Sequence, residues 1–259
     1  MKLAISGKGG VGKTTLAAVL SLLLARRGNK VLALDADPDA NLASALGIPA
    51  EKQKLIIPIS RQVALIEERT GAKIKQYGQI FKLNPEVSDI ADNYTVNHQG
   101  VSLLVLGAVK KGGGGCACPE NVLIKALVTD LLLNKNETLM MDMEAGIEHL
   151  GRGTARSVDT LIVVLEPGQS SVESAQRVIS LAKEIGLKDI RLVANKITGR
   201  ADEEFIRNSF PQMHILGFLP YTSEIRDADK SGVTVLDSIS PKLLNIFENI
   251  LNQLEKQED

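Results

Sequence analysis

Short apolar runs alternate along this chain with longer segments of helical pattern, and the alternation strongly constrains the fold. The run Leu161-Ile-Val-Val-Leu165 is apolar on both faces, as strands are when helices cover both sides of a parallel sheet. Strands are expected at residues 2–6, 30–34, 101–106, 138–142, 160–165, 190–195 and 215–219. Helices are expected at residues 14–27, 122–134, 172–185 and 241–255. The rhythm predicts an α/β fold with a doubly wound, mostly parallel sheet and helices on both faces.

Residues 49–100 interrupt this rhythm. They hold one expected helix, at residues 61–69 with Thr70-Gly71 as its stop, and then irregular polar sequence. We interpret the region as an insertion that carries partner contacts. Because no linker is evident, we expect residues 1–259 to form a single domain.

Charge and composition exclude some kinds of partner. The chain has 30 Lys+Arg against 31 Asp+Glu, a formal net charge of −1, and no basic run of the kind that binds nucleic acid. Aromatic residues make up 3%, too few for base-stacking platforms. No apolar run reaches the roughly 18 residues of a membrane span, and a glycine-rich segment begins too early for a signal peptide. We therefore expect a cytoplasmic protein without nucleic-acid or membrane partners.

A glycine-rich segment follows the first expected strand and opens the first expected helix. It reads G-K-G-G-V-G-K-T-T from Gly7 and matches G-x-x-x-x-G-K-[ST] in the strand-to-helix context that the motif requires. Lys13 would neutralise the β- and γ-phosphates of ATP, and the Thr14 hydroxyl would ligate magnesium. The remaining phosphate contacts are expected from the loop and the helix start: Gly9, Gly10, Val11, Gly12 and Thr15.

Carboxylates follow two of the expected strands. Asp35-Ala-Asp37-Pro-Asp39 comes after the second strand, and Asp142 ends the fourth. A doubly wound sheet binds its ligand beyond the carboxyl ends of its strands, so these acids are expected near the phosphate loop. Met140-Met141-Asp142 resembles the Walker B segment, and this resemblance implies that Asp142 holds magnesium, directly or through water, with Asp35 as a second magnesium residue. Turn and capping chemistry is the alternative for these acids.

The two cysteines, Cys116 and Cys118, flank Ala117 after a run of four glycines. In an extended segment residues i and i+2 project to the same side, so both sulfurs can point at one metal ion. Two thiolates fill half a site, and a twofold axis beside the motif would supply a second pair. Four thiolates suit zinc or nickel, and the spacing does not choose between them. A redox disulfide or two unremarkable thiols are the alternatives.

Lys8 makes the loop similar to the deviant phosphate loop of the MinD, ParA and nitrogenase iron protein group. The resemblance implies a homodimer in which Lys8 reaches the nucleotide of the other subunit. It also implies that Asp37 activates the attacking water, with Asp39 as the alternative. Asn195-Lys196 and Pro220 follow later strands, where the resemblance implies contacts with the adenine. Ordinary turn chemistry is an equal alternative for Pro220.

The chain as a whole resembles the CooC and AcsF type of accessory ATPase, which serves nickel carbon monoxide dehydrogenase and acetyl-CoA synthase. The matching segments are the Lys8 loop, Asp35-Ala-Asp-Pro-Asp, Cys116-x-Cys118-Pro-Glu-Asn, Met-Asp142-Met, and Ala-Gly-Ile-Glu-His-Leu-x-Arg-Gly-Thr-Ala. The resemblance implies an ATP-dependent nickel chaperone, with zinc as the other candidate metal. ATP would close the dimer around the cysteines, and hydrolysis would release the metal to the apo-enzyme. Glu144 and the long glycine run depart from the pattern and are compatible with a paralogue that serves a different client.

Two other functions stay open. A reductase similar to the nitrogenase iron protein would hold an iron–sulfur cluster at the dimer interface, but that family takes its two cysteines from distant positions. A MinD-like spatial regulator would carry a basic amphipathic helix. The last expected helix and the residues after it hold two lysines against four acids, a net charge of −2. The apolar stripe of this helix is therefore predicted to pack on the sheet.

Overall fold

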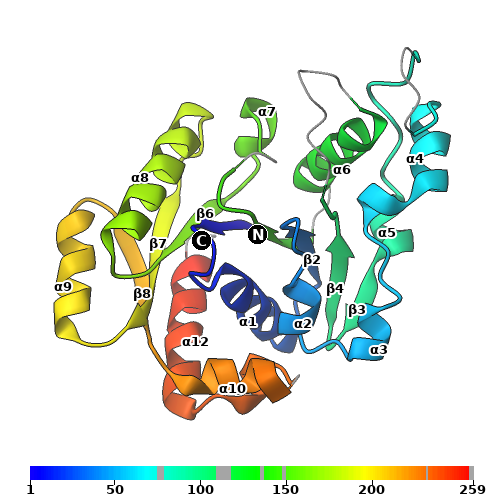
Figure 1. The fold of residues 1–259 in the computed structure, drawn as a ribbon. Helices are drawn as coiled ribbons and strands as arrows, with labels where there is room; N and C mark the ends of the chain where they lie inside the picture. The colour runs from blue at the N-terminus through cyan, green and yellow to red at the C-terminus, as the bar shows by residue number, and fades with distance from the viewer. Residues whose placement is uncertain (75–78, 109–117, 135–136, 148–149, 232, 257–259) are drawn as a thin grey trace.

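Eight strands form one sheet in the computed structural model, which describes residues 1–74, 79–108, 118–134, 137–147, 150–231 and 233–256 (Figure 1). The spatial order is β3-β4-β2-β5-β1-β6-β7-β8; β3 is antiparallel to β4, and the other neighbouring strands are parallel. The strands are β1 (Lys2–Gly7), β2 (Val31–Ala36), β3 (Val96–His98), β4 (Val101–Val105), β5 (Thr138–Met143), β6 (Thr160–Leu165), β7 (Ile190–Ile197) and β8 (His214–Pro220).

Helices cover both faces of this sheet (Figure 1). One face is covered by α1 (Lys13–Arg26), α2 (Leu42–Ala45), α10 (Ser223–Ser231), α11 (Val235–Ser238) and α12 (Pro241–Glu255). The other is covered by α4 (Val63–Thr70), α5 (Ile90–Tyr94), α6 (Pro119–Asn134), α7 (Arg152–Ala155), α8 (Gln169–Glu184) and α9 (Arg200–Ser209). The short helix α3 (Ala50–Gln53) and the 3-10 turn η1 (Ile59–Arg61) precede α4.

The apolar runs form the sheet because their side chains are buried on both faces. Within β1, Leu3 and Ile5 point into one hydrophobic core, and Ala4 points into the other. Helix α12 packs its apolar stripe on the first of these cores, where Phe247 is fully buried. The prediction that this helix packs on the sheet is confirmed. No helix in the described part of the chain is long and apolar enough to cross a membrane.

The predicted fold class is confirmed, but several boundaries differ. The expected second strand ends at residue 34, whereas β2 continues through Asp35 to Ala36. The expected sixth strand ends at residue 195, whereas β7 continues through a bulge to Ile197 and so also contains Lys196. The short helices α2, α3, α5, α7, α9, α10 and α11 were not predicted.

The described part of the insertion at residues 49–100 contains more regular structure than the sequence suggests. Its helix α4 begins two residues later than expected and ends at Thr70. The next residue, Gly71, caps the helix with a φ of 74°, the left-handed conformation typical of a helix C-cap. The insertion also supplies the edge strand β3, which was not predicted because three residues carry too little periodic signal.

Candidate functional site

The glycine-rich loop lies between the end of β1 and the start of α1, and contacts with neighbouring strands require its glycines. A Cβ on Gly7 would lie 2.1 Å from the Val164 carbonyl oxygen of β6. Gly12 has a φ of 98°, and a Cβ there would lie 2.3 Å from the Asn195 amide nitrogen of β7. Side chains are excluded at both positions, so the loop backbone passes close to two strands.

Lys13 is buried at the first position of α1, with 6% of its surface exposed. Its Nζ donates to the Lys8 carbonyl oxygen at 3.4 Å. The ammonium group therefore points back over the loop, where a phosphate group would lie in the predicted complex.

Two aspartates face one another across neighbouring strands. Asp35 of β2 pairs in register with Asp142 of β5, and both are fully buried. Asp35 accepts hydrogen bonds from the backbone N–H of Leu42 at 2.9 Å and of Asp37 at 3.2 Å. Burial is the main cause that raises the pKa of Asp35 to about 7, and the Asp142 charge adds to it.

The Asp142 carboxylate is buried without a hydrogen-bond partner on either oxygen among the described residues. Burial raises its pKa to about 6, although the adjacent Thr14 hydroxyl and Lys13 ammonium group lower it. Thr14 lowers this pKa, although neither Asp142 oxygen accepts a hydrogen bond from the described residues. A buried, unpaired carboxylate is costly, and a bound cation would remove that cost. Asp142 and Thr14 thus offer oxygen ligands suited to magnesium.

The two acids after β2, Asp37 and Asp39, differ in their contacts and in their exposure to solvent. The backbone N–H of Asp37 donates to the Asp35 carboxylate at 3.2 Å, and the charge of Asp37 raises the pKa of both Asp35 and Asp142. Its Oδ1 also accepts a hydrogen bond from the Asp39 N–H at 3.0 Å. Asp39 is exposed. These positions support Asp37 rather than Asp39 as the residue that contacts the attacking water, which stays a prediction.

The segment after β5 is tied to β1 by Ser6, a residue that the sequence reasoning did not single out. The Ser6 hydroxyl donates to the Gly146 carbonyl oxygen at 2.7 Å and lies 3.3 Å from that of Glu144. Ser6 is fully buried. It therefore links the end of the strand before the phosphate loop to the segment that follows Asp142.

Lys8 lies at the mouth of the loop and contacts its own chain. Its Nζ donates to the Ser170 hydroxyl at the start of α8, at 2.7 Å, in an exposed position. Sequence reasoning missed Ser170 because it lies two residues before the expected helix start. The predicted contact of Lys8 with another subunit would require this hydrogen bond to break.

Asn195 connects β7 to the phosphate loop. Its side-chain amide donates to the Val11 carbonyl oxygen at 2.8 Å, and its Oδ1 accepts from the Lys196 N–H at 2.8 Å. Lys196 has a φ of 58° and forms an ion pair with Glu166 at 2.7 Å. Pro220 is exposed at the end of β8. The structure thus gives Asn195 a contact with the loop, and its predicted contact with adenine is untested.

The cysteine motif is described in part. Cys118 is half-buried, and its carbonyl oxygen accepts from the Val122 N–H at 3.1 Å where α6 begins. Burial is the main cause that raises the pKa of its thiol, and Glu120 contributes. Cys116 lies outside the described residues. Within the described ranges, no group of three or more His, Cys, Asp or Glu side chains is placed to hold a metal ion.

The fold and this loop define a P-loop nucleotide-binding protein with a doubly wound sheet. The CobQ/CobB/MinD/ParA nucleotide binding domain family matches residues 2–235, and the chain belongs to this family.

Relatives of known name cover nearly the whole chain. The carbon monoxide dehydrogenase accessory protein CooC of Rhodospirillum rubrum is 45% identical over 241 residues, 93% of this chain and 91% of that protein. An uncharacterised ATP-binding protein of Methanocaldococcus jannaschii is 40% identical over 259 residues, 99% of this chain and 98% of that protein. The MinC:MinD cell division complex of Aquifex aeolicus contains a chain of similar fold. Its TM-score is 0.70 at 20% identity, covering 98% of this chain and 95% of that chain.

Proposed function

We propose that this protein is an ATP-dependent nickel chaperone for the maturation of carbon monoxide dehydrogenase or acetyl-CoA synthase. The observation that carries the proposal is the 45% identity to a carbon monoxide dehydrogenase accessory protein along 93% of the chain. The Cys-x-Cys motif before α6 supplies thiolates that suit the cargo. The likeness to MinD structures supports the fold alone.

ATP would bind with its phosphates at the loop between β1 and α1. Lys13, whose ammonium group points back over the loop, would neutralise phosphate charge, and Asp37, which donates its backbone N–H to Asp35, would orient the attacking water molecule. Thr14 and Asp142, with Asp35 nearby, would hold magnesium, which supplies charge neutralisation during hydrolysis. These residues support the proposal that the protein hydrolyses ATP to ADP and phosphate.

Lys8 connects nucleotide binding with the metal in this proposal. In the chain as it stands, Lys8 is held by Ser170 at an exposed position, so a second subunit can reach it. ATP would draw Lys8 to the other subunit and close a homodimer. Closure would unite two Cys116–Cys118 pairs around nickel or zinc, and hydrolysis would reopen the dimer and release the metal. We place this cycle in the cytoplasm, without nucleic-acid or membrane partners.

Metal content tests the proposal directly. Purified protein should hold about one nickel ion per two chains in the presence of a non-hydrolysable ATP analogue. Cys116→Ser and Cys118→Ser should each lose nickel, because two thiolates of the four are removed per dimer. ATP binding should stay within about twofold, since both cysteines lie outside the phosphate loop.

Three outcomes would contradict the proposal. Undiminished nickel in both cysteine variants would remove the metal site. An iron–sulfur absorption spectrum with electron transfer would favour the reductase. ATP-dependent sedimentation with lipid vesicles would favour the spatial regulator, although the burial of the apolar face of α12 speaks against it.

A further inference from the structure

A buried hydroxyl group joins the end of β1 to the segment that follows β5. Ser6 directly precedes Gly7, the first residue of the phosphate loop, and none of its surface is exposed. Its hydroxyl donates to the Gly146 carbonyl oxygen at 2.7 Å, and the Glu144 carbonyl oxygen is a second acceptor at 3.3 Å. We define residues 144–147, which directly follow β5, as the β5 turn.

The β5 turn is closed by a hydrogen bond of its own. The Gly146 N–H donates to the Glu144 carbonyl oxygen at 2.7 Å, so this donor is used within the turn. Glu144 and Ala145 are exposed, whereas Gly146 is buried and Ile147 packs in the hydrophobic core. The turn is therefore anchored at its inner end, and its outer end can change conformation without exposing apolar core residues.

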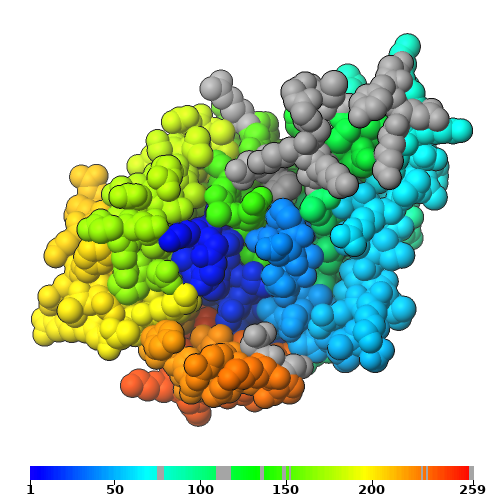
Figure 2. Space-filling model, viewed as in Figure 1, coloured from blue at the N-terminus to red at the C-terminus, as the bar shows by residue number. Residues whose placement is uncertain are grey.

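The β5 turn lies beside the groups that are proposed to hold ATP and magnesium. It begins two residues after Asp142, and Ser6 bonds it to the residue that precedes the phosphate loop. Figure 2 shows the loop, in dark blue, at the surface next to the green segments that follow β5. In nucleotide switches, the γ-phosphate and its magnesium ion hold the neighbouring loops, and hydrolysis releases them. The β5 turn is in the place of such a loop.

The closed turn has no backbone donor ready for a phosphate at Gly146. Its N–H can bind a phosphate oxygen only after it leaves the Glu144 carbonyl oxygen. Opening the turn in this way would also separate the Gly146 carbonyl oxygen from Ser6, which would leave a buried hydroxyl without its acceptor. The hydroxyl of Ser6 therefore favours the closed turn over the open one.

We propose that Ser6 is a positioning residue that holds the β5 turn closed until the γ-phosphate of ATP binds. This inference rests on the ATP site of the proposed function. ADP lacks the γ-phosphate and leaves the turn closed, so the hydrogen bond from Ser6 opposes the binding of ATP and does not affect the binding of ADP. After hydrolysis the same hydrogen bond returns the turn to its closed conformation.

Calorimetric titration of the full chain with ADP and with a non-hydrolysable ATP analogue, both with magnesium, tests the inference. Ser6→Ala should bind the analogue about fivefold more tightly than the wild type, because it removes the hydroxyl that favours the closed turn. Its affinity for ADP should stay within about twofold. Ser6→Thr keeps the hydroxyl and should retain the wild-type ratio of the two dissociation constants. Ser6→Cys has a weaker donor of similar size, so it should shift the ratio in the direction of Ser6→Ala and serves if that variant fails to fold.

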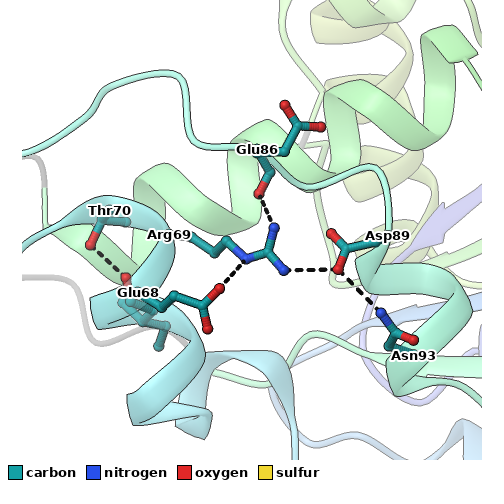
Figure 3. A network of polar contacts seen from close by, with 7 residues as sticks. Glu68, Arg69, Thr70, Glu86, Asp89 and Asn93 are labelled. Carbon is teal, nitrogen blue, oxygen red and sulfur yellow. Dashed lines mark hydrogen bonds and ion pairs between the residues drawn. The ribbon is translucent and has the colours of Figure 1, made fainter.

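Two control variants separate this role from the general effect of a lost polar group. Ser21→Ala removes a buried hydroxyl of α1 that has no hydrogen-bond partner among the described residues. Arg69→Gln breaks a polar bridge between α4 and the chain that enters α5 (Figure 3). The Arg69 guanidinium group donates to Asp89 Oδ2 at 2.8 Å and to the Glu86 carbonyl oxygen at 3.5 Å. Arg69→Gln should lower Tm, and both controls should keep the ratio within about twofold of wild type.

Each other result would overturn the inference. An unchanged ratio in Ser6→Ala, with both nucleotides bound, would remove the role of Ser6 and leave the proposed function intact. An equal loss of affinity for both nucleotides would show instead that Ser6 supports the phosphate loop. The same shift of the ratio in Ser21→Ala or Arg69→Gln would show that the effect is not specific to the β5 turn. A wild type that binds neither nucleotide would overturn the ATP site of the proposed function together with this inference.

Discussion

Some side chains near the phosphate loop lower the stability of the folded protein and are suited to bind a ligand. Asp142 is the clearest case. Its carboxylate is fully buried and has no hydrogen-bond partner within the described ranges, which raises the free energy of the folded state. Its counterpart Asp35 has two backbone donors, so the two acids that meet across β2 and β5 differ in how well they are satisfied. Residues of this kind are retained for ligand binding at the expense of stability.

Asp142→Asn should therefore stabilise the nucleotide-free protein. We expect an increase of about 1 kcal/mol, or about 2–4 °C in Tm at pH 8, since the amide needs no counterion. The pKa of Asp142 is raised from 3.8 to about 6, so its destabilising effect develops as the pH rises from about 4 to about 6 and is complete above that value. The gain in Tm should then be larger at pH 8 than at pH 5. Calorimetry with and without magnesium and ATP measures this, and the added stabilisation by ligand should be lost in the variant.

Lys8 and Ser170 should affect dimer formation in opposite directions. Lys8→Ala should weaken ATP-driven dimerisation about tenfold or more, because a charged contact to the second nucleotide is removed, while nucleotide binding by the monomer changes little. Ser170→Ala should tighten dimerisation about two- to threefold, since Lys8 loses the hydrogen bond that holds it in its own chain. Sedimentation equilibrium with an ATP analogue measures both. An unchanged dimer in Lys8→Ala would contradict the role in the second subunit.

At the scale of elements, the phosphate loop depends on strands that are distant in sequence. It follows β1, contacts β6 at Gly7, and is bonded to β7 through the Asn195 side chain at Val11. The end of β1 is also joined to the segment after β5 by Ser6. The loop conformation is therefore a property of four neighbouring strands and not of the motif alone.

Asn195→Ala distinguishes support of the loop from recognition of adenine. If Asn195 mainly holds the loop, the variant should bind ATP and GTP about tenfold less tightly, with their ratio unchanged, because the phosphate site common to both is disturbed. If Asn195 recognises the base, ATP should lose affinity while GTP does not. Titration with fluorescent analogues of both nucleotides measures the ratio.

At the scale of the whole molecule, the proposed metal site is incomplete in one chain. Two cysteines per chain supply half of a four-thiolate set, so nickel binding should depend on the dimer. Lys8→Ala, whose cysteines are intact, should then lose nickel together with ATP-driven dimerisation. Native mass spectrometry with nickel and an ATP analogue measures chain number and metal in one experiment. A Lys8→Ala monomer that retains nickel would show that the metal site is independent of nucleotide.

Much of the fold follows from local sequence patterns. The apolar runs of β1, β5 and β6 indicate these strands, and the phosphate loop can be identified from its residue types and their spacing. The edge strand β3 and the short helices contain too few residues for a periodic signal, so their formation depends on tertiary contacts.

The sequence by itself determined the doubly wound fold class, the nucleotide loop and the presence of a paired cysteine motif, because each depends on residues that are close together in the chain. The tertiary structure decided which groups meet: Asp35 with Asp142, Lys8 with Ser170, and Asn195 with the loop. These contacts join residues on different strands and helices, so they exist after the sheet has assembled. The burial of the Asp142 carboxylate, which finds no hydrogen-bond partner in the part of the chain that the structure describes, is likewise a tertiary property that a linear sequence does not specify.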